Sequence, residues 1–295
     1  MKKRKKSSYF GAMINPTNFH RSQIKFYMIL IPILLLMVLP IIFIISHAFK
    51  PLDELYAYPP RFFASRVTFD NFRQLMNASQ QSGIPFGRYL FNSLMSASIV
   101  IFLSLLLSSL AAFAFSFLDF KGKKWLFAAN QVAIMFVAIA VAVPRYIVMN
   151  VLGVTNSFAA HIVPLIAMPV GVFLLKQFMD QIPRELHDAA KIDGANRFQI
   201  YRMIVLPLVK PALATIAILA FQSAWNNVET SQLFISDEAL KTLPYYFSTL
   251  TLGTSGIAAQ GMAAAASLII FLPNIILFII LQKNVMNTMA HSGLK

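Results

Sequence analysis

The sequence predicts an all-α polytopic membrane protein with six transmembrane helices. Of its 295 residues, 58% are hydrophobic and only 12% are charged, whereas soluble domains carry about 25% charged residues. A water-soluble fold of this size cannot bury so much apolar surface. Long segments without a charge recur along the chain, and about 20 apolar residues suffice to cross the hydrocarbon core of a bilayer. We therefore expect a single transmembrane domain over residues 1–295.

The first expected span follows the basic N-terminal stretch MKKRKK. Its apolar run is longer than the 7–15 residues of a signal-peptide core, so we expect a membrane anchor that is retained. The second span is free of charge between Arg88 and Asp119 and is rich in serine and alanine, and the sixth begins with a run of alanines at 263–266. Such small residues allow close helix packing in lipid.

The third and fourth spans are separated by Gly153–Ser157, which reads as a turn. Prolines within spans are tolerated, because packed neighbours satisfy the freed backbone groups. A long outer loop is expected at about 50–88. The expected spans are about 26–48, 90–117, 125–149, 159–179, 205–228 and 262–282.

The formal net charge of +14 would suggest nucleic-acid binding in a soluble protein. Here most Lys and Arg residues lie at the N-terminus and in alternate loops, which is the pattern of the positive-inside rule. We therefore predict cytoplasmic N- and C-termini and no nucleic-acid partner. The basic residues predicted to lie outside are Lys50, Arg61, Arg66, Arg73, Arg88, Arg145 and Lys241.

The most highly charged segment lies between the fourth and fifth spans, at about 183–204. Pro183 suits the first turn of a short helix, whose apolar stripe would comprise Leu186, Ala189, Ala190 and Ile192. Gly194 is predicted to stop this helix in a left-handed conformation. A second short helix is expected to follow. The two helices would form a compact knob, or an amphipathic loop resting on lipid headgroups.

A spaced motif runs through this segment. Asp188-Ala189-Ala190, three residues, Gly194, nine residues and then Ile204-Val205-Leu206-Pro207 resemble the EAA motif of ABC importer permeases, EAA-x3-G-x9-I-x-LP. Asp188 replaces the glutamate of that motif. Three weaker matches elsewhere in the chain occur in the same order as in the family. Arg88–Ser93 resembles its RYLxNS segment, Ala111–Lys124 its AAYAFARLRFPGRK turn, and Ser292–Lys295 its C-terminal tail.

The resemblance covers nearly the whole chain and is closest to the smaller permease of maltose-type carbohydrate transporters. It implies the fold of a type I ABC importer permease in a bacterial inner membrane. It also implies a second permease, two ABC ATPase subunits that bind ATP and Mg²⁺, and an extracellular sugar-binding protein. In that family the knob couples to the ATPases. The positions carried over are Asp188, Ala189, Ala190, Asp193, Gly194, Arg197, Leu206 and Pro207, and for the tail Gly293, Leu294 and Lys295.

Polar residues in or near the spans are candidates for a substrate path, because intramembrane polar groups often line one; the alternative is hydrogen bonding between helices. The cluster that closes the fifth span offers amides, a carboxylate and an indole face to a sugar, although the tryptophan would also suit an interface anchor. The candidates are Asn92, Gln131, Gln222, Trp225, Asn226, Asn227 and Glu229.

No catalytic constellation is evident in the sequence. It contains no cysteine and no P-loop motif, so ATP hydrolysis would belong to partner subunits. A membrane enzyme acting on a lipid-linked sugar would need paired carboxylates or metal ligands, and Asp53 and Glu54 are the only close acidic pair at a helix end. A proton-coupled transporter would need a carboxylate within a span, and none is found there. The sugar-importer permease is therefore the leading interpretation.

Overall fold

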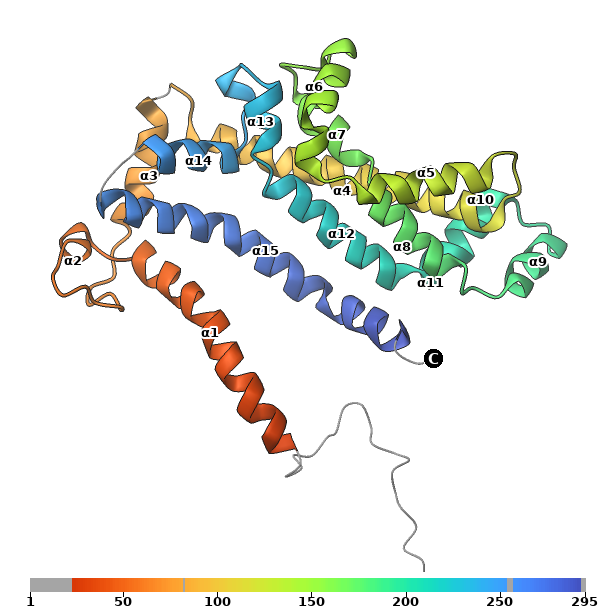
Figure 1. Ribbon diagram of the computed structural model, residues 1–295, viewed down its shortest axis with the longest axis horizontal. Coiled ribbons are helices and arrows are strands. Elements are labelled where there is room, and N and C mark those ends of the chain that lie inside the picture. Colours follow the sequence, from red (N-terminus) through yellow and green to blue (C-terminus); the bar gives the residue numbers. More distant parts are fainter. Residues whose placement is uncertain (1–22, 82, 254–256, 293–295) are drawn as a thin grey trace, which may run out of the picture.

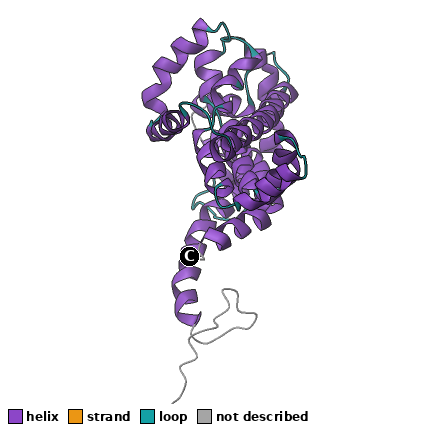
Figure 2. Ribbon diagram, turned by 90° about the vertical axis from the view of Figure 1, so that its right-hand side faces the viewer, coloured by secondary structure: helices purple, strands orange, loops and turns teal. Residues whose placement is uncertain are grey.

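The computed structural model describes residues 23–81, 83–253 and 257–292, and all regular elements in these ranges are helices (Figures 1 and 2). Three single helices are long and apolar enough to cross a membrane: α1 (Ile24–Ala48), α4 (Phe86–Phe117), and Ala259–Lys283 within α15 (Ile257–Ser292). They contain the expected first, second and sixth spans. Up to six crossings result when three bent helix pairs are each counted as one span.

The expected third, fourth and fifth spans are each broken. The fourth span consists of η3 (Phe158–His161), α7 (Val163–Ile166) and α8 (Pro169–Met179) and bends by 41°. Its break lies at Met168, whose ψ of 84° is non-helical, and a following proline disfavours the helical conformation at that position. In the fifth, α12 (Lys210–Trp225) is bent by 82° from the preceding segment. Pro211, in the first turn of α12, lacks the N–H that a continuous helix needs.

The third span shows the sharpest break. α5 (Lys123–Met135) is bent by 110° from the segment formed by η2 (Ala138–Val141) and α6 (Ala142–Val151). Phe136 and Val137 take extended backbone angles, with ψ of 131° and 132°. No proline or glycine stands at this break. The sequence therefore carries no local signal for it, and a continuous span is expected at 125–149.

Helix α4 is the centre of the bundle and packs against both α8 and α12, while α15 packs against α12 and α1 (Figure 1). The buried face of α4 is built largely from small residues, among them Ser96, Ala97, Ser104 and Ala112. Gly171 of α8 lies so close that a Cβ there would be 2.9 Å from Ser108 Oγ. The expected close packing through small residues is confirmed.

The short elements gather at two ends of the molecule (Figure 1). At one end lie α9 (Arg184–Ile192), α10 (Arg197–Ile200), the π-helix η4 (Tyr201–Val205) and α11 (Leu206–Leu208). At the other end lie α2 (Leu52–Leu55), α3 (Asp70–Gln81) and α14 (Leu243–Gly253), with α13 (Glu229–Phe234) and η5 (Glu238–Leu240) nearby. The segment that carries the spaced motif is thus separated from the long loops by the length of the spans.

Candidate functional site

The knob, residues 183–204, begins with α9 and turns at Gly194. Gly194 has a φ of +81°, and two hydrogen bonds close the turn: Gly194 N–H to Lys191 O at 3.0 Å and Ala195 N–H to Ala190 O at 2.9 Å. This pair of bonds is a Schellman motif, which needs a left-handed residue after the helix. The left-handed stop predicted at Gly194 is confirmed.

The buried face of α9 differs from the predicted apolar stripe. His187 and Ala190 face the core, and the His187 ring stacks on Phe117 at the end of α4, with ring centroids 5.1 Å apart. Leu186 is 47% exposed and Ile192 87% exposed. Of the four residues of the predicted stripe only Ala190 packs inward, and Leu186, Ala189 and Ile192 are exposed.

The second half of the knob is fastened to α4. Asn196 and Gln199 form a reciprocal capping box that starts α10, which satisfies two N–H groups at its N-terminus. Tyr201 then lies against α4, with its hydroxyl 2.7 Å from Ser109 Oγ and its ring edge-on to Phe113. The core here also includes Ala190, Leu175 and Val205. A force applied to the knob would therefore reach α4 and α8 directly.

The remaining candidates in and after the knob lie mostly on the surface. Asp188 is exposed and close to two basic residues on its own helix, with Oδ1 at 3.7 Å from Lys191 Nζ and 3.5 Å from His187 Nδ1. Such exposed pairs contribute little stability, so the Asp188 carboxylate is available to a partner. Asp193, Arg197 and Pro207 are also exposed, and Leu206 packs partly against the core.

A groove bordered by α1, α12 and α15 brings two path candidates together. It has a volume of about 490 Å³ and is lined by Gln222, Asn226 and Asn274 together with apolar side chains such as Ile45 and Phe271. Asn274 Nδ2 donates to Asn226 Oδ1 at 3.3 Å and to Ile270 O at 2.9 Å. Asn274 Oδ1 is buried without a hydrogen-bond partner. We call this the amide groove.

A second hollow of about 240 Å³ adjoins the amide groove and shares Asn226, Ser267 and Ile270 with it. Together they follow one face of α15. A largely apolar wall with a few polar groups is the usual composition of a small-molecule site.

The structure gives the other path candidates different partners. Trp225 is only 1% exposed; its indole N–H donates to Ile270 O at 2.9 Å, and its ring stacks on Phe221. Asn227 Oδ1 accepts the N–H and the hydroxyl of Thr230, both at 2.8 Å. These side chains are satisfied internally, so neither an indole face nor the Asn227 amide oxygen is open to a sugar.

Glu229 and Gln131 also lie apart from the amide groove. Glu229 forms a salt bridge with Arg145 of α6 at 3.1 Å, which ties α13 to the broken third span. Gln131 is exposed on α5 and does not line the groove. The tail candidates Gly293, Leu294 and Lys295 lie outside the described residues.

Asn92 is part of a structural feature that the sequence did not reveal. The side chain is 1% exposed and its amide donates to Ala239 O and Lys241 O, both at 2.9 Å. Arg88 Nε also donates to Ala239 O, at 3.1 Å, and Ser93 Oγ accepts the Leu243 N–H at 2.8 Å. The segment resembling RYLxNS thus holds the 238–243 connection in place. We call this arrangement the outer clamp.

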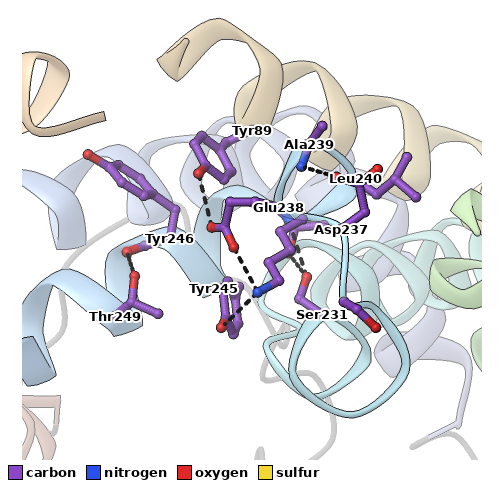
Figure 3. Close-up of polar contacts among 12 residues, drawn as sticks. Tyr89, Ser231, Asp237, Glu238, Ala239, Leu240, Tyr245, Tyr246 and Thr249 are labelled. Atoms are coloured by element: carbon purple, nitrogen blue, oxygen red, sulfur yellow. Dashed lines mark hydrogen bonds and ion pairs between the residues drawn. The ribbon is translucent and has the colours of Figure 1, made fainter. Parts of the chain in front are cut away.

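A charged network completes the outer clamp (Figure 3). Glu238 accepts the Tyr89 hydroxyl at 3.0 Å and pairs with Lys241 Nζ at 2.8 Å, and Nζ also donates to the Tyr245 hydroxyl at 3.1 Å (Figure 3). Burial lowers the pKa of Lys241, but its bonds to Glu238 and Tyr245 outweigh burial and raise that pKa above its usual value. Burial, reinforced by the neighbouring Tyr89, raises the pKa of Tyr246 to about 12.

The adjacent acidic residues Asp53 and Glu54 both form contacts within the loop after α1. Glu54 accepts the backbone N–H groups of Ser65 and Arg66, at 2.8 and 3.0 Å. Asp53 pairs with the Arg66 guanidinium. Both carboxylates therefore stabilise the loop after α1 rather than converging on a common point.

Comparison with known proteins gives a family for the chain. The profile of the family described as "Binding-protein-dependent transport system inner membrane component" matches residues 83–285. The trehalose transport system permease protein SugB of Mycobacterium tuberculosis is 30% identical over 87% of this chain and 92% of its own length. The arabinooligosaccharides transport system permease protein AraQ of Halalkalibacterium halodurans is 31% identical over 88% and 91%.

A solved structure shares the fold. The crystal structure of a bacterial ABC transporter involved in the import of the acidic polysaccharide alginate contains a chain that superposes with a TM-score of 0.77. The match covers 91% of this chain and 99% of that chain at 21% sequence identity. At this level of identity the likeness concerns the fold alone.

Proposed function

The chain belongs to the family of binding-protein-dependent transport system inner membrane components, and from this premise we propose that it is one permease subunit of an ABC importer for a sugar or an oligosaccharide. The family is one of transport components rather than of enzymes. The cargo class is supported by the relatives, which are named for trehalose and arabinooligosaccharides. Others are named for sulfoquinovosyl glycerol and galactooligosaccharides.

The observation that carries this proposal is the knob. It leaves Leu186, Ala189 and Ile192 exposed on one short helix, beside the exposed carboxylate of Asp188. Exposed apolar residues at the end of a membrane protein, rimmed by charge, suit a protein partner. We assign the knob as the docking site of a separate ATPase subunit, which would bind ATP and Mg²⁺. Two such subunits, a second permease and an extracellular sugar-binding protein would complete the importer.

The coupling route follows from the contacts of the knob. Closure of the ATPases would displace α9, and the His187–Phe117 stack and the Tyr201–Ser109 hydrogen bond would carry that displacement to α4. Because α4 packs directly on α12, the walls of the amide groove would shift with it. Gln222 and Asn226 are the residues we assign to the sugar path, since amides can donate to and accept from sugar hydroxyls.

Paired glycine variants test this function. Gly194 and Gly153 both have positive φ, +81° and +68°, and a Cβ added at either would meet only open space, but only Gly194 lies in the knob. A β-branched residue at such a φ costs about 1–3 kcal/mol of backbone strain. We expect Gly194→Val to assemble with its partners but to lose sugar-stimulated ATP hydrolysis by about tenfold or more, while Gly153→Val retains it.

The charge of the knob supplies a second test. Asp188→Lys reverses a charge at the docking surface and should weaken retention of the ATPase subunits, whereas Asp119→Lys, on the exposed turn after α4, should not. Normal transport by both the Gly194 and the Asp188 variants would refute the docking assignment. Loss of transport in the Gly153 variant to the same degree would show a general folding defect instead.

A further inference from the structure

The loop that follows α1 folds back along that helix instead of extending away from it (Figure 1). Ser46, in the last turn of α1, donates its hydroxyl to Phe62 O at 2.8 Å and accepts the Ala64 N–H at 3.0 Å. The ring of Phe62 also packs against Phe43 of α1, with centroids 5.7 Å apart. The loop is therefore fixed beside the final turns of a membrane-spanning helix.

The contact with Phe43 sets the depth of this loop. α1 has 25 residues and is about 37 Å long, and Phe43 lies about 7.5 Å before its end at 1.5 Å per residue. The hydrocarbon core is about 30 Å thick, so α1 exceeds it by a few ångströms at each end. Phe62 therefore lies close to the boundary between hydrocarbon and headgroups.

Several polar groups of the loop and of the residues before it are paired within the chain. Lys50, only 2% exposed, donates its ammonium to Arg61 O. Glu54 accepts two backbone N–H groups, from Ser65 and Arg66. A loop whose backbone is paired in this way can approach the apolar part of a bilayer, where unpaired groups would be costly.

The outward side chains of the same loop are aromatic. Tyr58 is 96% exposed, Phe63 66% and Tyr56 56%, and the exposed Arg61 lies between them in sequence. Aromatic side chains concentrate at membrane–water interfaces, and an arginine at that depth can pair with lipid phosphates. We propose that residues 56–66, the aromatic loop, are seated in the headgroup layer of the leaflet in which α1 ends, with Tyr58 and Phe63 inserted among the lipids.

Spin labels can test this seating, because the chain has no cysteine of its own. Tyr58→Cys and Phe63→Cys would each be introduced into the full-length chain, purified with its partner subunits, spin-labelled and placed in nanodiscs of phosphatidylcholine and phosphatidylglycerol. Gln74→Cys is the matched control, since it is exposed on α3 beyond the loop. Frequent collisions of a spin label with oxygen indicate that the label lies in lipid, and frequent collisions with a water-soluble nickel chelate indicate that it lies in water.

We expect labels at 58 and 63 to collide with oxygen several-fold more, relative to the nickel chelate, than the label at 74. An oxygen-to-nickel ratio at 58 and 63 equal to that at 74 would place the loop in water and overturn the proposal. Protection from both reagents would mean that a protein partner covers the loop, which would also overturn it. Because the test reads depth alone, its outcome is independent of the sugar-import assignment.

Discussion

Asn92 is the residue on which the outer clamp depends most. Its amide group satisfies two backbone carbonyls of the 238–243 connection. Asn92→Ala would leave Lys241 O without its side-chain donor and Ala239 O with Arg88 Nε alone. An unsatisfied carbonyl in this buried site costs about 1–3 kcal/mol. We expect a lower midpoint of thermal unfolding in detergent. Ser98→Ala is the control: Ser98 is exposed on the same helix, and its loss should change the midpoint little. Equal midpoints for the two variants would contradict the role of Asn92.

Asn226 and Trp225 are neighbours with different assigned roles. Asn226 lines the amide groove, whereas Trp225 is buried with its N–H bonded to Ile270 O. We expect Asn226→Ala to raise the apparent KM for the transported sugar by up to about tenfold, the worth of one hydrogen bond of roughly 0.5–1.5 kcal/mol. Trp225→Phe should lower thermal stability without raising KM. The reverse pattern in transport assays would exclude the groove as the sugar path.

Single residues also show what sequence can and cannot predict. The backbone of Gly194 was predictable, because a glycine after a short amphipathic helix has one common use, the left-handed stop. The partner of Asn92 was not, because a polar residue in an apolar span indicates only that some buried group needs it. The burial of Trp225 was equally hidden, since an aromatic residue at the end of a span suits an interface, a ligand or a core.

The stability of helix α14 and of the outer clamp is expected to depend on pH in the alkaline range, because the pKa values of Tyr246 and Lys241 are raised. The raised pKa of Tyr246, about 12 against 10.0 for an ordinary tyrosine, means that the folded state favours the neutral phenol. Its stabilising contribution is complete below pH 10 and is lost as the pH rises from 10 to about 12. The raised pKa of Lys241 acts in the same direction above its ordinary value of 10.5.

Thermal unfolding as a function of pH measures this effect. We expect the unfolding midpoint to fall between pH 10 and 12, and to fall less in Tyr246→Phe, which has no phenol to ionise. An alkaline slope that is identical in wild type and Tyr246→Phe would contradict the assignment.

At the scale of elements, two of the three broken spans carry a signal in sequence. Pro169 and Pro211 each stand at a break, and proline restricts both its own φ and the residue before it. The break after Met135 has no such marker: Phe136 and Val137 are extended, and neither residue is a proline or a glycine. Hydropathy locates charge-free segments, but it does not show where a segment bends.

The whole molecule separates the knob from the outer clamp by the length of its spans (Figure 1). The distribution of basic residues predicts that the knob lies in the cytoplasm and the outer clamp outside. Single cysteines introduced at Glu185 and Gln232, both exposed, test the topology. They would be labelled with a membrane-impermeant maleimide in cells whose plasma membrane is intact and whose outer layers have been removed. Position 232 should react at once and position 185 only after permeabilisation. The opposite order would invert the topology.

The central claim is that an ATPase subunit docks on the knob, and cross-linking tests it most directly. A photo-reactive phenylalanine at Ile192, which is 87% exposed on α9, would be compared with one at Ile139, 84% exposed in η2. In the assembled, transport-competent complex we predict a cross-link from position 192, but not from 139, to a polypeptide that contains a P-loop. A complex that transports normally but gives no such cross-link from position 192 would contradict the account.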